Sequence, residues 1–315
     1  MLASVATVSR VLETAGHEVT RVSVQPDLAW FGSVREADLV FNLCEGVGGV
    51  SRLEVNVASM MELAGIPFTG CSAWTMAVCH RKPLLNAFLA SRGVPVPRWH
   101  VPEGAAAVPD DFPLPAIVKP AAEDASIGIE QGSVVTSPSA LRDRVALVRE
   151  RHGTAIVQQY IAGRELAVGF VGDGILPLSE IDFTHLPAGA WPIVSFAAKW
   201  LEASPEFAGT QPVCPADVDA DLANRIVQMA ALAWQAVEGR GYGRVDLRVD
   251  ADGNPWVLEV NPNPDLSADA GLANMARARG WSYDRLVLQI VEAARSGRRQ
   301  SPAVPITSTR EVSLA

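Results

Sequence analysis

Much of the segment 241–265 alternates between apolar and polar positions, and this pattern predicts a β-hairpin. Valine and leucine take every second position in 245–249, with charged residues between them, as in a strand with one buried face. After a turn at Asp252-Gly253 the alternation continues through 256–261. The face opposite the valines and leucine of the first strand is expected to carry Arg244, Asp246 and Arg248, joined from the second strand by Val257, Glu259 and Asn261.

The oxygen donors on this face match the chemistry of a magnesium site. With the hairpin in register across its turn, Asp246, Glu259 and Asn261 meet on one side. They offer two carboxylates and an amide oxygen, hard ligands that suit Mg²⁺ and leave room for phosphate oxygens. Arg244 points the same way and presents a planar cation to an oxyanion or phosphate. The alternative is a hairpin whose charged side faces water, but a carboxylate in the otherwise apolar second strand needs a partner.

Towards the N terminus, short apolar segments alternate with amphipathic ones. The expected elements are helices over 4–15, from Ser51 onwards and over 73–91, and strands over 18–24, 38–43 and 66–69. Strands that alternate with helices indicate a parallel, Rossmann-like α/β sheet, which we assign to residues 1–95. The third helix is expected to break at Pro83, because proline removes a backbone donor.

The remainder of the chain predicts two α+β lobes, 96–180 and 181–295, and a tail. The expected elements are strands over 116–120, 154–161, 166–171 and 175–181, and helices over 137–151, 219–238, 272–279 and 283–295. The small-residue loop 121–128 follows a strand lysine, an arrangement that suits phosphate because backbone N–H groups can approach closely. Residues 296–315 contain Ser, Arg, Pro and Thr with little apolar content, which predicts a disordered tail.

Composition narrows the class of partner. Hydrophobic residues make up 49% of the 315-residue chain and charged residues 19%, which is typical of a globular protein. A formal net charge of −9 argues against nucleic acid or an anionic membrane as partner. No apolar run reaches the roughly 20 residues of a membrane span, and no signal peptide is evident. The four cysteines form no Cys-x-x-Cys pair, which favours reduced thiols in a cytoplasmic protein over a zinc site.

The hairpin sequence GYGRVDLRVDADGNPWVLEVNPNPD resembles the magnesium hairpin of ATP-grasp ligases, in particular the D-alanine–D-alanine ligase family. The resemblance implies an ATP-grasp fold, in which the N-terminal α/β domain precedes two lobes that enclose ATP. It implies that Asp246, Glu259 and Asn261 hold two magnesium ions, or manganese instead, and that Arg244 stabilises the transition state. The residues implied to bind ATP are Lys82, Lys119, Ser126, Gly128, Gln158, Gln159, Tyr160, Ile161, Glu165 and Lys199.

Some of these residues have simpler interpretations. Lys82 could be an ordinary surface lysine; the family has Asp-Lys where this chain has Arg81-Lys82, so only the lysine is kept. Glu165 could be a surface glutamate, although it matches the acid that holds the ribose hydroxyls after the adenine hinge at Tyr160. The family's first strand and its acidic residue precede the first helix and have no counterpart here. Either the coding sequence starts upstream or this domain is reduced.

The resemblance implies a carboxylate–amine ligase that activates its substrate as an acyl phosphate. The acceptor residues differ from those of enzymes that join two D-alanines: Ala125, Trp200, Asp265 and Ala270 occupy their positions. We therefore expect an amino-acid or dipeptide-like substrate whose acceptor differs from D-alanine, contacted by Glu45, Asp265 and Ser267. True D-alanine–D-alanine ligation is one alternative, and a non-catalytic ATP-binding protein is another. A homodimer would fit the family.

Overall fold

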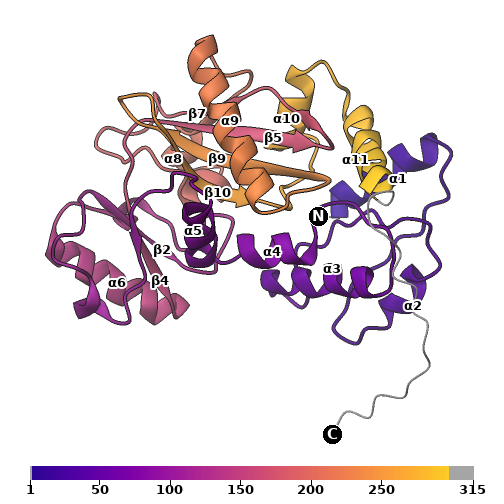
Figure 1. Cartoon of the computed structure of the whole chain (residues 1–315), viewed down its shortest axis with the longest axis horizontal. Helices are drawn as coiled ribbons and strands as arrows, with labels where there is room; N and C mark the ends of the chain where they lie inside the picture. The colour runs from indigo at the N-terminus through magenta and orange to yellow at the C-terminus, as the bar shows by residue number, and fades with distance from the viewer. Residues whose placement is uncertain (1, 298–315) are drawn as a thin grey trace, which may run out of the picture.

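The computed structural model describes residues 2–297 and is drawn in Figure 1. Its helices are α1 (Leu2–Thr14), α2 (Trp30–Val34), α3 (Glu54–Leu63), α4 (Ala73–Cys79), α5 (Lys82–Ser91), α6 (Pro138–His152), α7 (Phe196–Trp200), α8 (Pro205–Ala208), α9 (Ala220–Ala236), α10 (Gly271–Ala278) and α11 (Tyr283–Gly297). Short 3₁₀ helices span Ser51–Leu53, Ala105–Ala107 and Gln131–Ser133. The predicted disordered tail, 296–315, lies outside the described residues except for the last two residues of α11.

The N-terminal part contains less β-structure than the sequence predicts. A single parallel bridge joins Val40 to Phe68, within the segments expected to be strands, and the strand expected at 18–24 is not formed. A β-ladder gains its stability from successive backbone hydrogen bonds between neighbours, and one bridge provides few of them. Packing of α3, α4 and α5 organises this part instead. The predicted helix over 73–91 is divided into α4 and α5, and Pro83 lies in the first turn of α5, which begins at Lys82.

The first lobe is a four-stranded antiparallel sheet in the order β1-β4-β2-β3. Its strands are β1 (Trp99–His100), β2 (Ala116–Pro120), β3 (Val134–Val135) and β4 (Ala155–Gln159). Helix α6 begins at an N-cap, where the Ser137 side chain accepts a hydrogen bond from the backbone of Ala140, and it packs on β2 and β4. Val118, Val145 and Val157 are fully buried between helix and sheet.

The second lobe is a six-stranded sheet in the order β10-β9-β5-β7-β8, with β6 paired to β5. Its strands are β5 (Arg164–Val171), β6 (Gly174–Ile175), β7 (Ser179–Asp182), β8 (Gln211–Val213), β9 (Tyr242–Val249) and β10 (Pro255–Asn261). β5 is the neighbour of β9, so the sheet division falls between β4 and β5, whereas the sequence placed the lobe boundary at 180. Helix α9, capped by Asp219, lies across this sheet beside α4 and α5 (Figure 1).

The predicted hairpin forms, with one irregularity. Val257 pairs with Leu247, but the next pair is Glu259 with Asp246, so Leu258 is an extra residue in β10. The bulge places Val257 in the core, fully buried, whereas the strict alternation predicted it on the charged face. Beyond the bulge the alternation resumes, so Glu259 still shares a face with Asp246.

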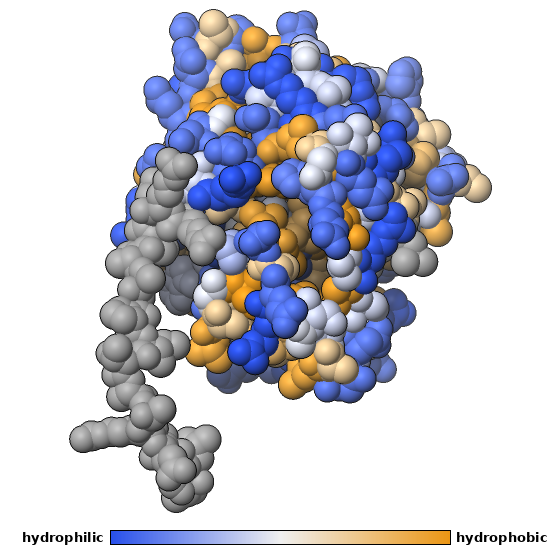
Figure 2. All heavy atoms as spheres, turned by 90° about the vertical axis from the view of Figure 1, so that its right-hand side faces the viewer, coloured by the Kyte–Doolittle hydropathy of each residue, from blue (hydrophilic) through white to orange (hydrophobic). Residues whose placement is uncertain are grey.

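One hydrophobic cluster spans the N-terminal helices and the second lobe. It joins residues of α3, α4 and α5, such as Met61, Met76 and Leu85, to Val245 and Val260 of the hairpin. On the face drawn in Figure 2 most of the surface is hydrophilic, and apolar side chains show in patches between polar ones. Within residues 2–297 no helix is long and apolar enough to cross a membrane.

Candidate functional site

The charged face of the β9–β10 hairpin assembles four of the predicted residues. In the strand register Glu259 lies opposite Asp246, and Asn261 lies opposite Arg244. Arg244 makes a bidentate ion pair with Asp246, with Nε–Oδ1 and Nη2–Oδ2 distances of 2.6 and 2.8 Å. The charge of Asp246 raises the pKa of Arg244 above its ordinary value, and Glu259 adds to this effect. The arginine is therefore a permanent cation held beside the two carboxylates.

The donor set of this face fits magnesium. Asp246 and Glu259 supply carboxylate oxygens and Asn261 an amide oxygen, a combination that Mg²⁺ shares with phosphate oxygens and water. No group of three or more His, Cys, Asp or Glu side chains is close enough to hold a metal among residues 2–297. The predicted set has two carboxylates and would depend on the amide and the nucleotide for its other ligands. The Asn261 Oδ1 atom accepts a hydrogen bond from the Asn263 backbone at 3.0 Å, which orients the amide.

Arg248 occupies the same face two residues beyond Asp246 and anchors the predicted ribose acid. Only 3% of Arg248 is exposed, and its Nε and Nη2 atoms donate to Glu165 Oε2 at 3.1 and 2.8 Å. Arg248 also donates to the carbonyl of Ile161 at 2.8 Å and lies over the Tyr160 ring, 4.8 Å from its centroid. The arginine thus ties the predicted adenine hinge to the hairpin. The sequence placed it on this face and gave it no role.

The hinge itself lies at the end of β4. The amide of Gln159 donates to the Arg98 carbonyl at 2.8 Å and that of Tyr160 to the Pro115 carbonyl at 2.9 Å. Gln158 is buried within the sheet. These two amides and the Ile161 carbonyl are therefore already hydrogen-bonded within the protein.

Three predicted lysines come from three different elements. Lys119 on β2 has its pKa lowered to about 8 by burial and by the charge of Lys82, while Glu259 and Glu165 oppose the shift. Lys199 on α7 has its pKa lowered by desolvation and by Arg244. Glu259 is among the charges that act on both Lys119 and Lys199, so positive charge from two elements lies near the hairpin carboxylates. A polyanion is the natural ligand for positive charge gathered in this way.

The small-residue loop after β2 turns back under α7. Ala125 and Ser126 both have positive φ, +55° and +61°, which is uncommon for residues other than glycine. Ser126 Oγ donates to the Val194 carbonyl at 2.8 Å, and the Trp200 indole donates to the Ala125 carbonyl at 2.9 Å. Gly128 has φ of +73°. A Cβ there would lie only 2.6 Å from the Pro120 ring, so glycine is required for the loop to fold against its own strand.

A chain of polar contacts that the sequence did not reveal connects this loop to the N-terminal helices. His80 Nδ1 lies 2.7 Å from Asp124 Oδ2, and its Nε2 is hydrogen-bonded to Glu54 Oε1. Lys82 Nζ donates to Asp124 Oδ1 at 3.2 Å and to the Glu123 carbonyl. Burial lowers the pKa of His80, but its hydrogen bonds to Asp124 and Glu54 outweigh this and raise it to about 9. The available signal was a run of charges, His80-Arg81-Lys82, after an apolar helix.

The predicted substrate residues gather at the other end of the hairpin. Glu45 is exposed, and partial desolvation followed by the charge of Asp265 raises its pKa. Asp265 Oδ1 accepts hydrogen bonds from the backbone and hydroxyl of Ser267 at 2.8 and 2.7 Å. The Ser267 hydroxyl also lies 3.0 Å from that of Ser4 on α1. The first helix therefore borders the site, which the sequence pattern did not indicate.

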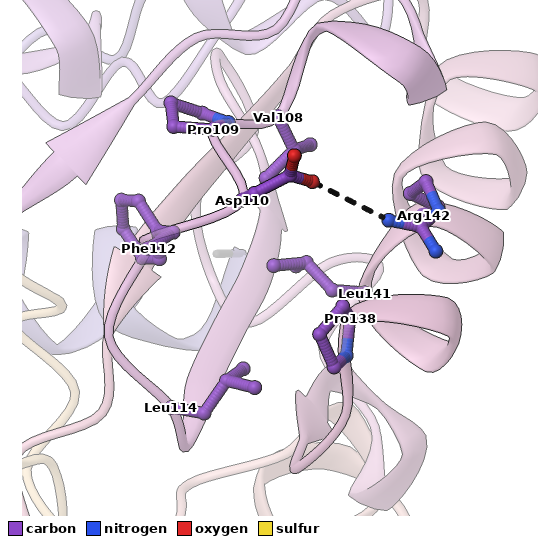
Figure 3. A pocket seen from close by; sticks show the side chains of 8 residues that line it. All are labelled: Val108, Pro109, Asp110, Phe112, Leu114, Pro138, Leu141 and Arg142. Carbon is purple, nitrogen blue, oxygen red and sulfur yellow. Dashed lines mark ion pairs between the residues drawn. The ribbon is translucent and has the colours of Figure 1, made fainter.

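A separate small pocket lies in the first lobe, between the segment before β2 and the start of α6 (Figure 3). Asp110 and Arg142 face each other across its rim at 4.0 Å, while Phe112, Leu114 and Leu141 line its wall. None of the predicted site residues lines it. Its apolar lining is continuous with the core under α6, so the pocket is a packing defect of that lobe and not part of the site.

Comparison with known proteins relates this chain, including the segment that carries the hairpin, to a family of ligases. Residues 94–292 match the family model described as D-ala D-ala ligase C-terminus. An uncharacterized protein, y4sG, of Sinorhizobium fredii is 33% identical over 266 residues, which cover 82% of this chain and 75% of that protein. A D-alanine–D-alanine ligase of Gloeobacter violaceus is 28% identical over 291 residues, covering 90% of this chain and 91% of its own.

Solved structures agree on the fold. The D-alanine–D-alanine ligase from Bacillus anthracis complexed with ATP superimposes with a TM-score of 0.75 at 21% sequence identity, covering 94% of this chain and 93% of the other. The mixed α/β architecture with two lobes around the hairpin is that of the ATP-grasp fold, so the fold predicted from the sequence is confirmed.

Proposed function

The chain belongs to the D-ala D-ala ligase family, and from this premise we propose that it is an ATP- and Mg²⁺-dependent carboxylate–amine ligase. It would join an amino acid or dipeptide-like carboxylate to an amine and release ADP and phosphate. The observation that carries the proposal is the hairpin register, which sets Glu259 opposite Asp246 and Asn261 opposite Arg244. Two carboxylates, an amide and a partly buried guanidinium, with the proposed phosphate-binding lysines nearby, would form a site for a polyphosphate and its metal.

Each group has a role that its position supports. Asp246, Glu259 and Asn261 would hold Mg²⁺, or Mn²⁺ in its place, and we propose two such ions. When bound, the metal neutralises phosphate charge and polarises the transferred phosphoryl group. Lys82, Lys119 and Lys199 add positive charge around the phosphates, and the loop at Ser126 and Gly128 covers them.

The remaining proposed contacts concern adenosine. Tyr160 and Ile161 present backbone groups to the adenine edge, and the buried Gln158 and the backbone amide of Gln159 hold the strand that carries them. Glu165, held in place by Arg248, would accept hydrogen bonds from the ribose hydroxyls.

The chemistry then proceeds through this chain's own residues. The substrate carboxylate attacks the γ-phosphate and forms an acyl phosphate, and ADP leaves. The acceptor amine adds to the acyl carbon, and the oxyanion of the tetrahedral intermediate faces the Arg244 guanidinium. Collapse of that intermediate expels phosphate and leaves an amide. Arg244 suits this role because its ion pair with Asp246 keeps it charged and fixed in direction.

The acceptor is proposed to differ from D-alanine. Glu45, Asp265 and Ser267 cluster where the second substrate would lie, and the charge of Asp265 helps to raise the pKa of Glu45. A site lined by carboxylates disfavours an acceptor whose own carboxylate approaches them. Ligation of two D-alanines is the alternative that the printed names of relatives favour, and a non-catalytic ATP-binding protein is a second alternative.

The decisive experiment measures ADP release with Mg²⁺ and ATP against D- and L-amino acids, singly and in pairs. Release with one particular pair would support the proposal and name the substrates. Release with D-alanine alone would establish the first alternative. ATP binding without release for any pair would favour the non-catalytic protein.

Further expectations stay proposals of the same kind. The domain limits 1–95, 96–180 and 181–295 would be tested by limited proteolysis. A homodimer would be tested by light scattering in solution, and a cytoplasmic location by cell fractionation.

A further inference from the structure

His80 is the centre of a buried polar cluster that joins three segments of the chain. Glu54 comes from α3, Asp124 from the loop after β2, and Lys82 from the first turn of α5. The side chains of His80 and Glu54 are 13% and 5% exposed. The other carboxylate oxygen of Glu54 accepts a hydrogen bond at 2.7 Å from Asn263, in the loop that follows the metal-face residues of β10.

The geometry fixes the charge of the histidine. Both ring nitrogens lie within hydrogen-bonding distance of carboxylate oxygens, Nδ1 of Asp124 and Nε2 of Glu54. A carboxylate can only accept, so both nitrogens must carry hydrogens and the ring is an imidazolium. The cluster then holds two cations, His80 and Lys82, and two carboxylates, and its buried charges balance.

The contacts of Lys82 conflict with its proposed role. Its ammonium group is engaged by the Asp124 carboxylate and the Glu123 carbonyl, yet the proposed function requires it to contact nucleotide phosphate. Turning Lys82 towards phosphate would leave Asp124 without its lysine, and an uncompensated buried carboxylate is costly. The second oxygen of Asp124 is held by His80, so the carboxylate remains paired when the lysine moves.

We propose that His80 is a positioning residue for nucleotide binding: its positive charge holds the Asp124 carboxylate and so releases Lys82 to the phosphates. Through Glu54 and Asn263, His80 is also connected to the loop that follows β10. The inference rests on the proposed function, because it assigns phosphate as the alternative partner of Lys82. Arg81 precedes this lysine in the sequence, so its carboxylate partner, Asp124, comes from another element.

The test is a double-mutant cycle on Mg-ATP affinity. The variants are His80→Gln, Asp124→Asn and the pair together, each as full-length protein, with His17→Gln as a matched control on an exposed histidine. Titration calorimetry gives Kd for a non-hydrolysable ATP analogue with Mg²⁺, and steady-state ADP release gives KM for ATP and kcat. Thermal unfolding checks that each variant is folded.

We expect His80→Gln to raise Kd and KM for ATP roughly tenfold with a smaller change in kcat, because Asp124 then keeps Lys82. Asp124→Asn, which frees Lys82, should leave Kd unchanged or lower it. The double variant should return to within about threefold of wild type, since no charged carboxylate remains to be held. A role limited to packing would give no such rescue.

Other outcomes separate this inference from the proposed function. Tight nucleotide binding by wild type with an unaltered Kd in His80→Gln would overturn the inference alone. A double variant that binds Mg-ATP no more tightly than His80→Gln would also overturn the inference. A large loss of Mg-ATP affinity in Asp124→Asn would overturn it as well, and this single variant can be measured even if His80→Gln does not fold. A wild-type protein that binds no Mg-ATP would overturn the proposed function and this inference with it.

Discussion

Replacing Asp246 by asparagine removes one negative charge and leaves the shape of the side chain unchanged. In the structure this carboxylate makes two hydrogen bonds of 2.6 and 2.8 Å to Arg244. At an effective dielectric constant of about 20, a charge pair about 4 Å apart is worth about 4 kcal/mol. Asparagine keeps one acceptor oxygen, and the nearby Glu259 still compensates Arg244 in part, so we expect a loss of about 2–3 kcal/mol in the free energy of unfolding.

The catalytic loss should be larger than the loss of stability. The substitution removes a proposed metal ligand and the group that orients Arg244, and loss of one electrostatic contact to a transition state costs on the order of 10²–10³ in kcat. We therefore expect ADP release to fall at least a hundredfold, while folded protein remains.

The assay compares Asp246→Asn with Asp252→Asn, the same chemical change at the exposed tip of the same hairpin. Urea unfolding measures stability, and coupled ADP release at several Mg²⁺ concentrations measures turnover. The control should behave as wild type in both. An Asp246→Asn enzyme that turns over within tenfold of wild type at any Mg²⁺ concentration would refute the assignment of this face as the catalytic metal site.

Three further predictions follow from the charges around the site. Glu165→Ala should lower the free energy of unfolding by about 3–5 kcal/mol, because it leaves the buried Arg248 without its carboxylate partner, and adding Arg248→Met should restore most of that loss. Urea unfolding of the single and double variants measures this, and equal stabilities of the two variants would contradict it. ATP affinity should weaken as the pH rises through about 8, where Lys119 loses its proton, and calorimetry at pH 7 and 9 should show it; a flat profile would exclude a contact with phosphate. The folded-state pKa of His80, about 9, lies above its ordinary value of 6.5. The charged imidazolium therefore stabilises the fold by about 3 kcal/mol below pH 6.5, and this contribution is lost as the pH rises through 9. The difference in unfolding free energy between wild type and His80→Gln should shrink over the same pH range.

The local elements of the two lobes could be predicted from the sequence because their patterns are strong. The strand 116–120 has the predicted bounds, and the helix expected over 137–151 spans Pro138–His152. The Asp-Gly turn predicted the hairpin, and polar residues in an otherwise apolar strand singled out Glu259 and Asn261. Alternation and capping act over a few residues, so they can be recognised without knowledge of distant parts of the chain.

Sequence patterns predicted the structure less well where the pairing of distant strands determines it. The expected N-terminal strands are reduced to one bridge, because a strand exists only when a neighbouring segment supplies its hydrogen bonds. The bulge at Leu258 could not be recognised in the sequence either. Strict alternation placed Val257 on the charged face, whereas with the bulge its side chain lies in the hydrophobic core that also contains residues of α9.

The sequence by itself therefore determined the hairpin, the oxygen donors on its charged face, the strand lysine and the family. Only the tertiary structure decided which charges meet. Arg248 with Glu165, and His80 with Glu54 and Asp124, join residues separated by 26 to 83 positions along the chain. Contacts of that range leave no local pattern, because they exist only after separate helices, strands and loops have packed together and desolvated the groups between them.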